Sequence, residues 1–225
     1  MPPTDDVIPE PAEVTAIVLA GGTGERIGGL PKAFLDHGGR SLLDHAVTLL
    51  APFAASLVVC LPGDLLDRAP AGTIAVAGGA SRQASLLAGL ARAQTRFVVI
   101  HEVARPFATS GLVRAVLAAM TAGADAAVPV TPMTVRDSVV GLQEGRIVAV
   151  TPRENLGYSQ TPQAYRRERL DAALQAARAQ GRDEATAFAP LLRAGARIEA
   201  VAAPPGNIKI TYPEDLALLD RGGAS

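Results

Sequence analysis

Thr15-Ala16-Ile17-Val18-Leu19-Ala20-Gly21-Gly22-Thr23-Gly24 is the stretch that decides the fold. An uninterrupted apolar run is typical of a parallel strand buried on both faces. Glycines after such a strand let the backbone turn tightly and direct its N–H groups at an anion. A purely structural glycine turn has the same pattern, so this stretch predicts an opening strand of an α/β sheet and leaves the role of its loop open.

The alternation of short apolar runs and longer helical patterns continues beyond this strand. Further strands are predicted at Ser56–Leu61, Thr73–Ala77, Arg96–Ile100 and Asp125–Val130. Helices are predicted between them at Ser41–Leu50, Ser81–Gln94 and Ser110–Thr121. This order favours an α/β fold with a Rossmann-like, mostly parallel sheet and helices on both faces.

The pattern changes after Val130. Two polar-flanked runs, Arg136–Val140 and Arg146–Val150, surround Gly141–Gly145 and predict a protruding β-hairpin arm over about residues 135–152. The remaining elements are predicted as helices Arg166–Gln180 and Glu184–Ala194, and strands Arg197–Ala202 and Ile208–Ile210. We expect a single domain over residues 14–225, preceded by a flexible acidic leader at 1–13.

Composition excludes several classes of protein. The chain has 225 residues, 48% of them hydrophobic and 19% charged, with a net charge of −1, which argues against disorder and against a dedicated nucleic-acid binder. One cysteine, Cys60, and three histidines supply neither a disulfide nor a Cys/His metal cluster. The most apolar stretch, Ala46–Leu61, is broken by Pro52 and too short to cross a bilayer, and we expect a cytoplasmic protein.

Two familiar phosphate-binding motifs do not fit the glycine-rich loop. A dinucleotide fingerprint starting at Gly22 would need glycine at position 27, where Ile27 stands. A Walker loop needs Gly-Lys-Ser/Thr, which the chain lacks. What remains is a glycine-rich loop followed by Arg26 and Pro31-Lys32, whose two cations could wrap a triphosphate.

These residues carry a resemblance to a known family. Leu19–Arg26 followed by Pro31-Lys32 resembles the signature of nucleotidyltransferases that act on a phosphorylated small molecule. The segments that narrow the resemblance are Gly78-Gly-Ala-Ser-Arg-Gln-Ala-Ser85, His101-Glu-Val-Ala-Arg-Pro106, Thr161-Pro-Gln163 and Gly206-Asn-Ile-Lys-Ile-Thr211. Together, in this order, the segments resemble the 2-C-methyl-D-erythritol 4-phosphate cytidylyltransferases of the non-mevalonate isoprenoid pathway, over about Ala16 to Leu219.

The resemblance implies a substrate pair and a set of site residues. It implies transfer of a cytidylyl group from CTP to 2-C-methyl-D-erythritol 4-phosphate, with release of pyrophosphate. CTP would be bound by Ala20, Gly21, Gly22, Thr23, Gly24, Gly79, Ala80, Arg82 and Ser85. The acceptor would be bound by Arg105, Ser138, Arg153 and Thr161. Glu102 would hold Mg²⁺ or another divalent cation, and the arms would be exchanged in a homodimer.

Charge stabilisation explains the residues expected to be catalytic, Arg26, Lys32 and Lys209. Attack on the α-phosphorus of CTP builds negative charge on the equatorial oxygens and on the leaving pyrophosphate, which fixed cations stabilise. The acceptor phosphate is already anionic, so no general base is required. Lys32 and Lys209 are the only lysines of the chain, and both lie in motif segments.

Departures from the family pattern keep alternatives open. Glu102 stands where the family usually has aspartate, and Ala80 where it has an acidic residue. The alternatives are a cytidylyltransferase for another sugar-alcohol phosphate, such as ribitol 5-phosphate, and a non-catalytic nucleotide-binding module. For Glu102 the alternative to metal binding is an ion pair with Arg105, three residues further along.

Overall fold

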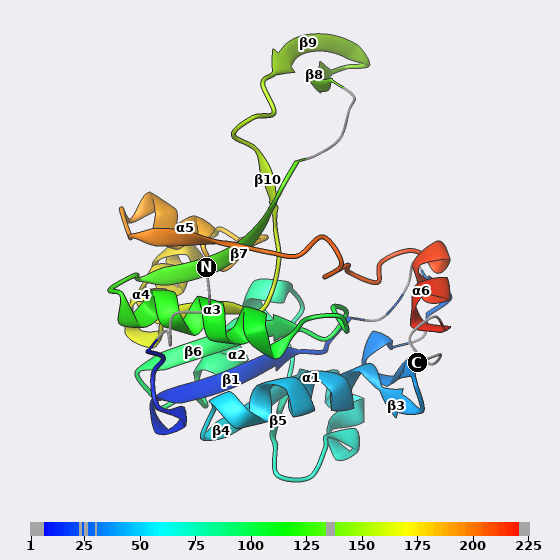
Figure 1. The fold of residues 1–225 in the computed structure, drawn as a ribbon, viewed down its shortest axis with the longest axis vertical. Helices are drawn as coiled ribbons and strands as arrows, with labels where there is room; N and C mark the ends of the chain where they lie inside the picture. The colour runs from blue at the N-terminus through cyan, green and yellow to red at the C-terminus, as the bar shows by residue number, and fades with distance from the viewer. Residues whose placement is uncertain (1–6, 23, 25–26, 30, 134–137, 221–225) are drawn as a thin grey trace.

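The molecule is built around one mixed sheet from which a two-stranded arm projects (Figure 1). The computed structural model describes the chain except for residues 1–6, 23, 25–26, 30, 134–137 and 221–225. The sheet strands are β1 (Val14–Leu19), β4 (Ser56–Leu61), β5 (Ile74–Ala77), β6 (Phe97–Glu102), β7 (Ala126–Pro132), β10 (Gly157–Ser159), β11 (Gln163–Arg166) and β12 (Ile198–Ala202).

The strand order is β10-β7-β11-β6-β1-β4-β5, with β12 paired to β7. The helices are α1 (Leu42–Leu50), α2 (Arg82–Leu90), α3 (Ser110–Thr121), α4 (Arg167–Ala179), α5 (Ala189–Arg193) and α6 (Ala217–Asp220). Short 3₁₀ segments are η1 (Pro11–Glu13), η3 (Lys32–Phe34), η4 (Ala51–Phe53), η5 (Gly63–Arg68) and η6 (Pro213–Leu216), and β2 (Asp36–His37) pairs with β3 (Arg40–Ser41). None of the helices in the described part of the chain has the length and apolar character needed to span a membrane.

The central strands are buried on both faces, as their continuous apolar sequences predict. In β1, Ala16 and Val18 belong to the core formed with α1 and α3, whereas Ile17 belongs to the core formed with α2 and α4. Successive side chains of a strand point to opposite faces, so each apolar run supplies both cores at once. The predicted α/β architecture, with helices on both faces of a mostly parallel sheet, is therefore confirmed.

Hydroxyl caps fix where three of the helices begin. Ser41, Ser81 and Thr109 each accept a hydrogen bond from the backbone N–H three residues further along, at the starts of α1, α2 and α3. Such caps satisfy amides that the first helical turn leaves without a partner. The cap at Ser81 sets the direction of Arg82, the first residue of α2 and a predicted site residue.

The arm consists of β8 (Val139–Gln143) and β9 (Arg146–Thr151), which pair with each other and leave the sheet through β7 and β10 (Figure 1). Its turn consists of Glu144 and Gly145, which both have positive φ. The turn is therefore shorter than the predicted tip, Gly141–Gly145. Gly141 instead lies within β8, where a Cβ atom would stand 3.2 Å from the Ala149 Cβ.

Several predicted elements differ from the structure. The predicted helix Glu184–Ala194 is reduced to α5, and Ile208–Ile210 is not a strand. β12 ends at Ala202. Pro204 and Pro205 follow shortly after it, and because prolines have no N–H group they cannot extend the hydrogen-bond ladder of β12. β10 and β11, which run antiparallel to β7, escape prediction because both are short and partly polar. The predicted leader is described only from residue 7.

Candidate active site

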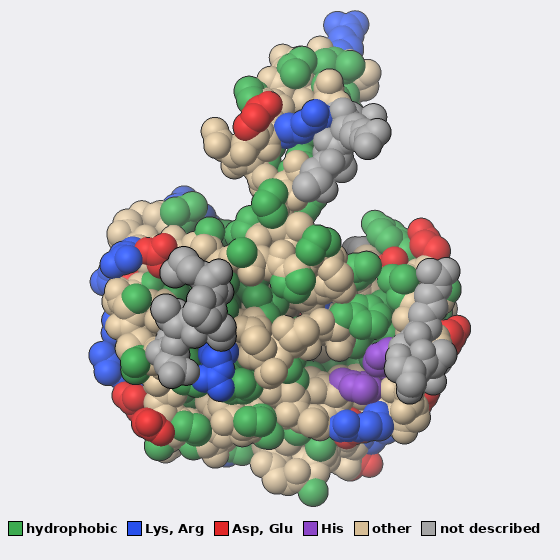
Figure 2. All heavy atoms as spheres, in the orientation of Figure 1, with side chains coloured by type: hydrophobic (Ala, Val, Ile, Leu, Met, Phe, Trp, Pro, Cys, Tyr) green, Lys and Arg blue, Asp and Glu red, His purple; other side chains and the backbone are tan. Residues whose placement is uncertain are grey.

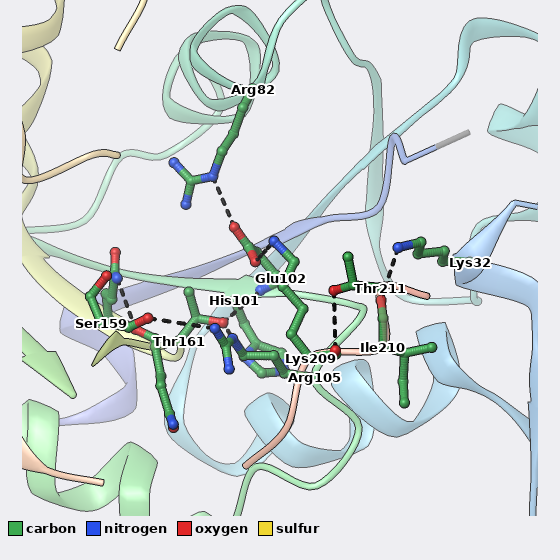
Figure 3. Close-up of polar contacts among 12 residues, drawn as sticks. Lys32, Arg82, His101, Glu102, Arg105, Ser159, Thr161, Lys209, Ile210 and Thr211 are labelled. Carbon is green, nitrogen blue, oxygen red and sulfur yellow. Dashed lines mark hydrogen bonds and ion pairs between the residues drawn. The ribbon is translucent and has the colours of Figure 1, made fainter. Parts of the chain in front are cut away.

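Glu102 is the centre of a group of charges at the carboxyl ends of the parallel strands. It closes β6, and its carboxylate lies between Arg82 from the start of α2 and Lys209 from the segment after β12 (Figure 3). Arg82 Nε donates to Glu102 Oε1 at 2.9 Å, and Lys209 Nζ lies 2.6 Å from Oε2. Ligand sites of open α/β sheets lie beyond this edge of the sheet.

The two cations keep Glu102 ionised. Burial alone would raise the pKa of this carboxyl, but the charges and hydrogen bonds of Lys209 and Arg82 outweigh burial and lower the pKa to about 2. The expected alternative, an ion pair between Glu102 and Arg105, is wrong: Arg105 donates instead to the backbone oxygens of Asn207, at 2.8 Å, and Ser159, at 3.5 Å. The charged partners come from distant segments that the sheet topology brings together.

The glycine-rich loop extends β1 toward this group. Ala20 is buried and continues the ladder, its N–H donating to the Cys60 carbonyl at 2.9 Å, while Gly21 and Gly22 are exposed beyond it. Gly24 has φ 69°, and its carbonyl accepts from the N–H groups of Ile27 and Gly29, so a tight turn forms there. The predicted roles of Thr23 and Arg26 lie outside the described residues.

Ser85 holds a second glycine segment beside the first. Its hydroxyl accepts from the Gly79 N–H at 3.1 Å and donates to the Ser81 carbonyl at 2.9 Å. A Cβ at Gly79 would stand 2.4 Å from the Ala84 Cβ, and one at Gly21 would stand 4.0 Å from the Ser85 Oγ. The structure thus places these two predicted CTP-binding segments next to each other and leaves Gly79 and Ala80 exposed.

The irregular segment 203–211, named here the lysine loop, brings three cations together. It carries Lys209, and its Asn207 backbone carbonyl accepts from Arg105 Nη1 at 2.8 Å. Its Ile210 carbonyl accepts from Lys32 Nζ at 2.8 Å (Figure 3). Lys32 and Lys209, far apart in the sequence, therefore meet at one loop. The neighbouring cavity of about 200 Å³ is lined by Arg82, Glu102, Arg105, Ser159, Gln160, Thr161, Gln163, Ala185, Thr186 and Lys209.

Thr161 connects the strand end to this cavity. Its hydroxyl oxygen accepts from the Glu102 N–H at 3.0 Å and lies 3.2 Å from His101 Nδ1. Burial lowers the pKa of His101 to about 4, so the imidazole is neutral near pH 7 and bonds to Thr161 as an uncharged partner. His101 therefore helps to position Thr161 and lies outside the cavity lining among the described residues.

Two predicted acceptor-binding residues are not brought into the cavity by this single chain. Ser138 and Arg153 flank the arm, and the described lining includes neither of them. Conversely, Gln160 and Thr186 line the cavity and Asn207 bonds to Gln160, although sequence reasoning assigns none of the three a role. Asn207 lies within the motif segment Gly206–Thr211, and Gln160 directly precedes the segment Thr161–Gln163. Their positions in or next to these segments were the sequence signal that could have indicated a role in the site.

Comparison with known proteins decides the family. Residues 14–221 match the model of the family described as IspD, 2-C-methyl-D-erythritol 4-phosphate cytidylyltransferase. The chain belongs to this family. The chain is also 40% identical to the 2-C-methyl-D-erythritol 4-phosphate cytidylyltransferase of Deinococcus radiodurans over 210 residues, which cover 91% of this chain and 87% of the relative.

Members of the cytidylyltransferase family from Thermus thermophilus are similar in both sequence and structure. A curated relative from this organism is 39% identical over 92% of this chain and 96% of its own length. The crystal structure of a cytidylyltransferase from the same organism superposes with a TM-score of 0.78 at 33% identity, covering 91% of this chain and 96% of that one. The predicted enzyme class and isoprenoid reaction are confirmed at the level of the family.

Proposed function

We propose that the cations gathered at the lysine loop perform the reaction that the family name states. A phosphate oxygen of 2-C-methyl-D-erythritol 4-phosphate attacks the α-phosphorus of CTP, the bond to the β-phosphate oxygen breaks, and pyrophosphate leaves. The observation that supports this proposal is the meeting of Lys32 and Lys209 at one loop beside the glycine-rich segment. Fixed positive charge at this point stabilises the charge that develops in the transition state.

We further propose separate roles for the two sides of the site. Backbone N–H groups at Gly21–Gly24 would hold the triphosphate, with Thr23 and Arg26 contributing to the same loop, and Gly79, Ala80, Arg82 and Ser85 would hold the cytidine. Arg105 and Thr161 would bind the acceptor phosphate from the cavity side. Arg105 suits this role because its guanidinium can pair with phosphate through two parallel hydrogen bonds.

Glu102 is the proposed protein ligand of Mg²⁺. No group of three His, Cys, Asp or Glu side chains in the described residues could hold a metal alone, but Mg²⁺ commonly uses one or two carboxylates together with substrate phosphates. Glu102 offers such a carboxylate, ionised and facing the cavity. Bound there, the metal would neutralise charge on the phosphates. The reaction is proposed to take place in the cytoplasm, where CTP is available.

The acceptor is tested by direct comparison. We expect pyrophosphate release from CTP to depend on 2-C-methyl-D-erythritol 4-phosphate and to be much faster with it than with ribitol 5-phosphate at equal concentration. A higher rate with ribitol 5-phosphate would assign the other acceptor. CTP binding by calorimetry without pyrophosphate release with either acceptor would indicate a non-catalytic module.

The arm is proposed to join two copies of the chain. Leu142, Ile147, Val148 and Val150 expose 59–71% of their surface along it. Figure 2 shows hydrophobic side chains on the surface of the arm. A two-stranded hairpin is marginally stable in water, and exposed apolar areas of this kind mark interaction surfaces. An exchanged arm in a symmetric homodimer would cover them and would bring Ser138 and Arg153 to the partner's acceptor site.

Mixed dimers test the exchange. Arg153→Ala and Lys209→Ala are each expected to be inactive alone, but a mixed dimer should regain activity, because one site then has an intact core and an intact arm. With random pairing, half of the dimers are mixed and one of their two sites is intact, so activity should reach about one quarter of wild type. No recovery on mixing, with both variants folded, would place Arg153 in its own chain's site.

A further inference from the structure

Asn207 lies at the middle of the lysine loop and is completely buried. The backbone carbonyl of Asn207 accepts a hydrogen bond from Arg105. Lys209 follows two residues later in the chain and pairs with Glu102, and the carbonyl of the next residue, Ile210, accepts from Lys32. The spacing of the three cations therefore depends on the conformation of one short segment. That segment has no strand ladder of its own.

The side chain of Asn207 anchors this segment to the rest of the site. Its Nδ2 donates to Gln160 Oε1 at 2.8 Å and to the Thr161 carbonyl at 2.9 Å, so both amide hydrogens are used. Backbone bonds hold the two ends of the loop, from the Ala203 N–H to Val130 and from the Ile210 N–H to Ala104. Between these ends, the backbone–backbone bonds within the described loop are local. Its long-range contacts are those of the Asn207 amide, the bond from Arg105 to the Asn207 backbone carbonyl, and the ion pair of Lys209 with Glu102.

We infer that Asn207 is a positioning residue for cytidylyl transfer. It does not line the cavity; it acts through Arg105, Lys209 and Lys32 by fixing the loop that they share. The two oxygens that accept from the Asn207 side chain are both carbonyl oxygens, so this side chain must be a donor. An aspartate at this position would place a carboxylate oxygen against them and would have no hydrogen to donate. A displacement of about 1 Å at a phosphate-transfer site can lower the rate about 10²-fold.

Gln160 extends the anchor toward the arm. While its Oε1 accepts from Asn207, its Nε2 donates to Thr131 Oγ1 at 2.8 Å, on the strand that leads into the arm. Gln160 is 7% exposed, so both of these bonds are shielded from water. This arrangement provides a matched control, because Thr131→Val removes the bond from Gln160 and the 3.4 Å bond from Thr131 Oγ1 to the Ala203 carbonyl, at the first residue of the loop, and leaves both Asn207 side-chain bonds in place.

The test compares Asn207→Asp and Asn207→Ala with Thr131→Val, using pyrophosphate release at saturating CTP, acceptor and Mg²⁺. We expect kcat to fall about 10²-fold in the Asn207 variants and less than about threefold in Thr131→Val. Thermal unfolding establishes that each variant is folded at the assay temperature. A merely structural role predicts a lower melting temperature with kcat per folded enzyme unchanged, and that result would overturn the inference.

Gln160→Met keeps the test decisive if the Asn207 variants do not fold. It removes one of the two acceptors and retains the length of the side chain, so we expect a smaller fall in kcat, about tenfold. An unchanged kcat in this variant would also overturn the inference. In a folded double variant, Gln160→Met should add little to Asn207→Ala, because residues that act as one unit are not additive.

This inference rests on the proposed roles of the three cations. The proposed reaction and the positioning role of Asn207 can nevertheless fail separately. If wild-type protein does not turn over CTP with either acceptor, the proposed reaction fails. Binding of inorganic pyrophosphate, followed by calorimetry, then decides the positioning role alone. Affinity should fall at least about tenfold in Asn207→Ala and remain unchanged in Thr131→Val. Equal affinity in all three proteins would reject the role of Asn207.

Discussion

Replacing Lys209 by Ala is expected to lower kcat by about 10²–10³-fold, because removing one donor that stabilises transition-state charge has effects of this size. Folding should be retained, since the Lys209 side chain is 42% exposed and Glu102 keeps its bond with Arg82. The measurement is pyrophosphate release at saturating substrates, combined with thermal unfolding. We expect Lys32→Ala to behave in the same way, through its position on the Ile210 carbonyl.

Arg169→Ala is the matched control for loss of a positive charge. Its side chain is 56% exposed and pairs with Asp125 at 3.5 Å, at the amino-terminal end of β7 and away from the carboxyl end of β6. Its kcat should remain within about twofold of wild type, since exposed ion pairs contribute little. Lys209→Ala with a kcat as high as that of the control would remove Lys209 from the mechanism.

Glu102→Gln is expected to lower both stability and metal affinity. At neutral pH the variant leaves Arg82 and Lys209 without their carboxylate, and loss of charged hydrogen bonds of this kind destabilises a protein by about 1–3 kcal/mol. The Mg²⁺ concentration for half-maximal rate should also rise, whereas Glu102→Asp, which keeps a carboxylate, should remain active. A metal requirement unchanged in Glu102→Gln would remove Glu102 as a ligand.

The stability difference between wild type and Glu102→Gln should depend on pH in a defined interval. The pKa of Glu102 is about 2 in the folded protein, against an ordinary value of 4.5. The unfolded chain therefore takes up the proton first as pH falls, and the stabilisation, complete above pH 4.5, is lost between pH 4.5 and 2. Unfolding by denaturant at several pH values should show the two proteins converging. A constant difference over this whole interval would contradict the ion pairs.

The parallel core could be predicted from sequence because its signals are local. β4 and α3 have the predicted bounds, and β1 lies within one residue of Thr15–Ala20, the apolar part of the opening stretch. Apolar runs and hydroxyl caps depend on neighbouring residues. β11 was missed because it owes its burial to contacts distant in sequence. Its Tyr165 is fully buried and pairs with Val98 of β6 and Ala126 of β7, neighbours that no local sequence pattern contains.

The site shows the same division. The glycine-rich and lysine-containing segments could be recognised from their residues and from their order along the chain. The two charged partners of Glu102 could not be predicted in this way. Sequence proximity favoured Arg105, whereas the fold brings Arg82 and Lys209 to the carboxylate and turns Arg105 toward the lysine loop. Asn207 had no predicted role, because its effect depends on which carbonyls surround it after folding.

The meeting of Lys32 and Lys209 has a practical consequence for chemical probing. Since the chain contains no other lysine, a reagent that modifies primary amines has only these two side chains and the terminal amino group to react with. Covalent labelling would therefore report on the phosphate side of the site with little background. Protection of the two lysines by CTP or pyrophosphate could be read by mass spectrometry from single peptides, without a coupled assay.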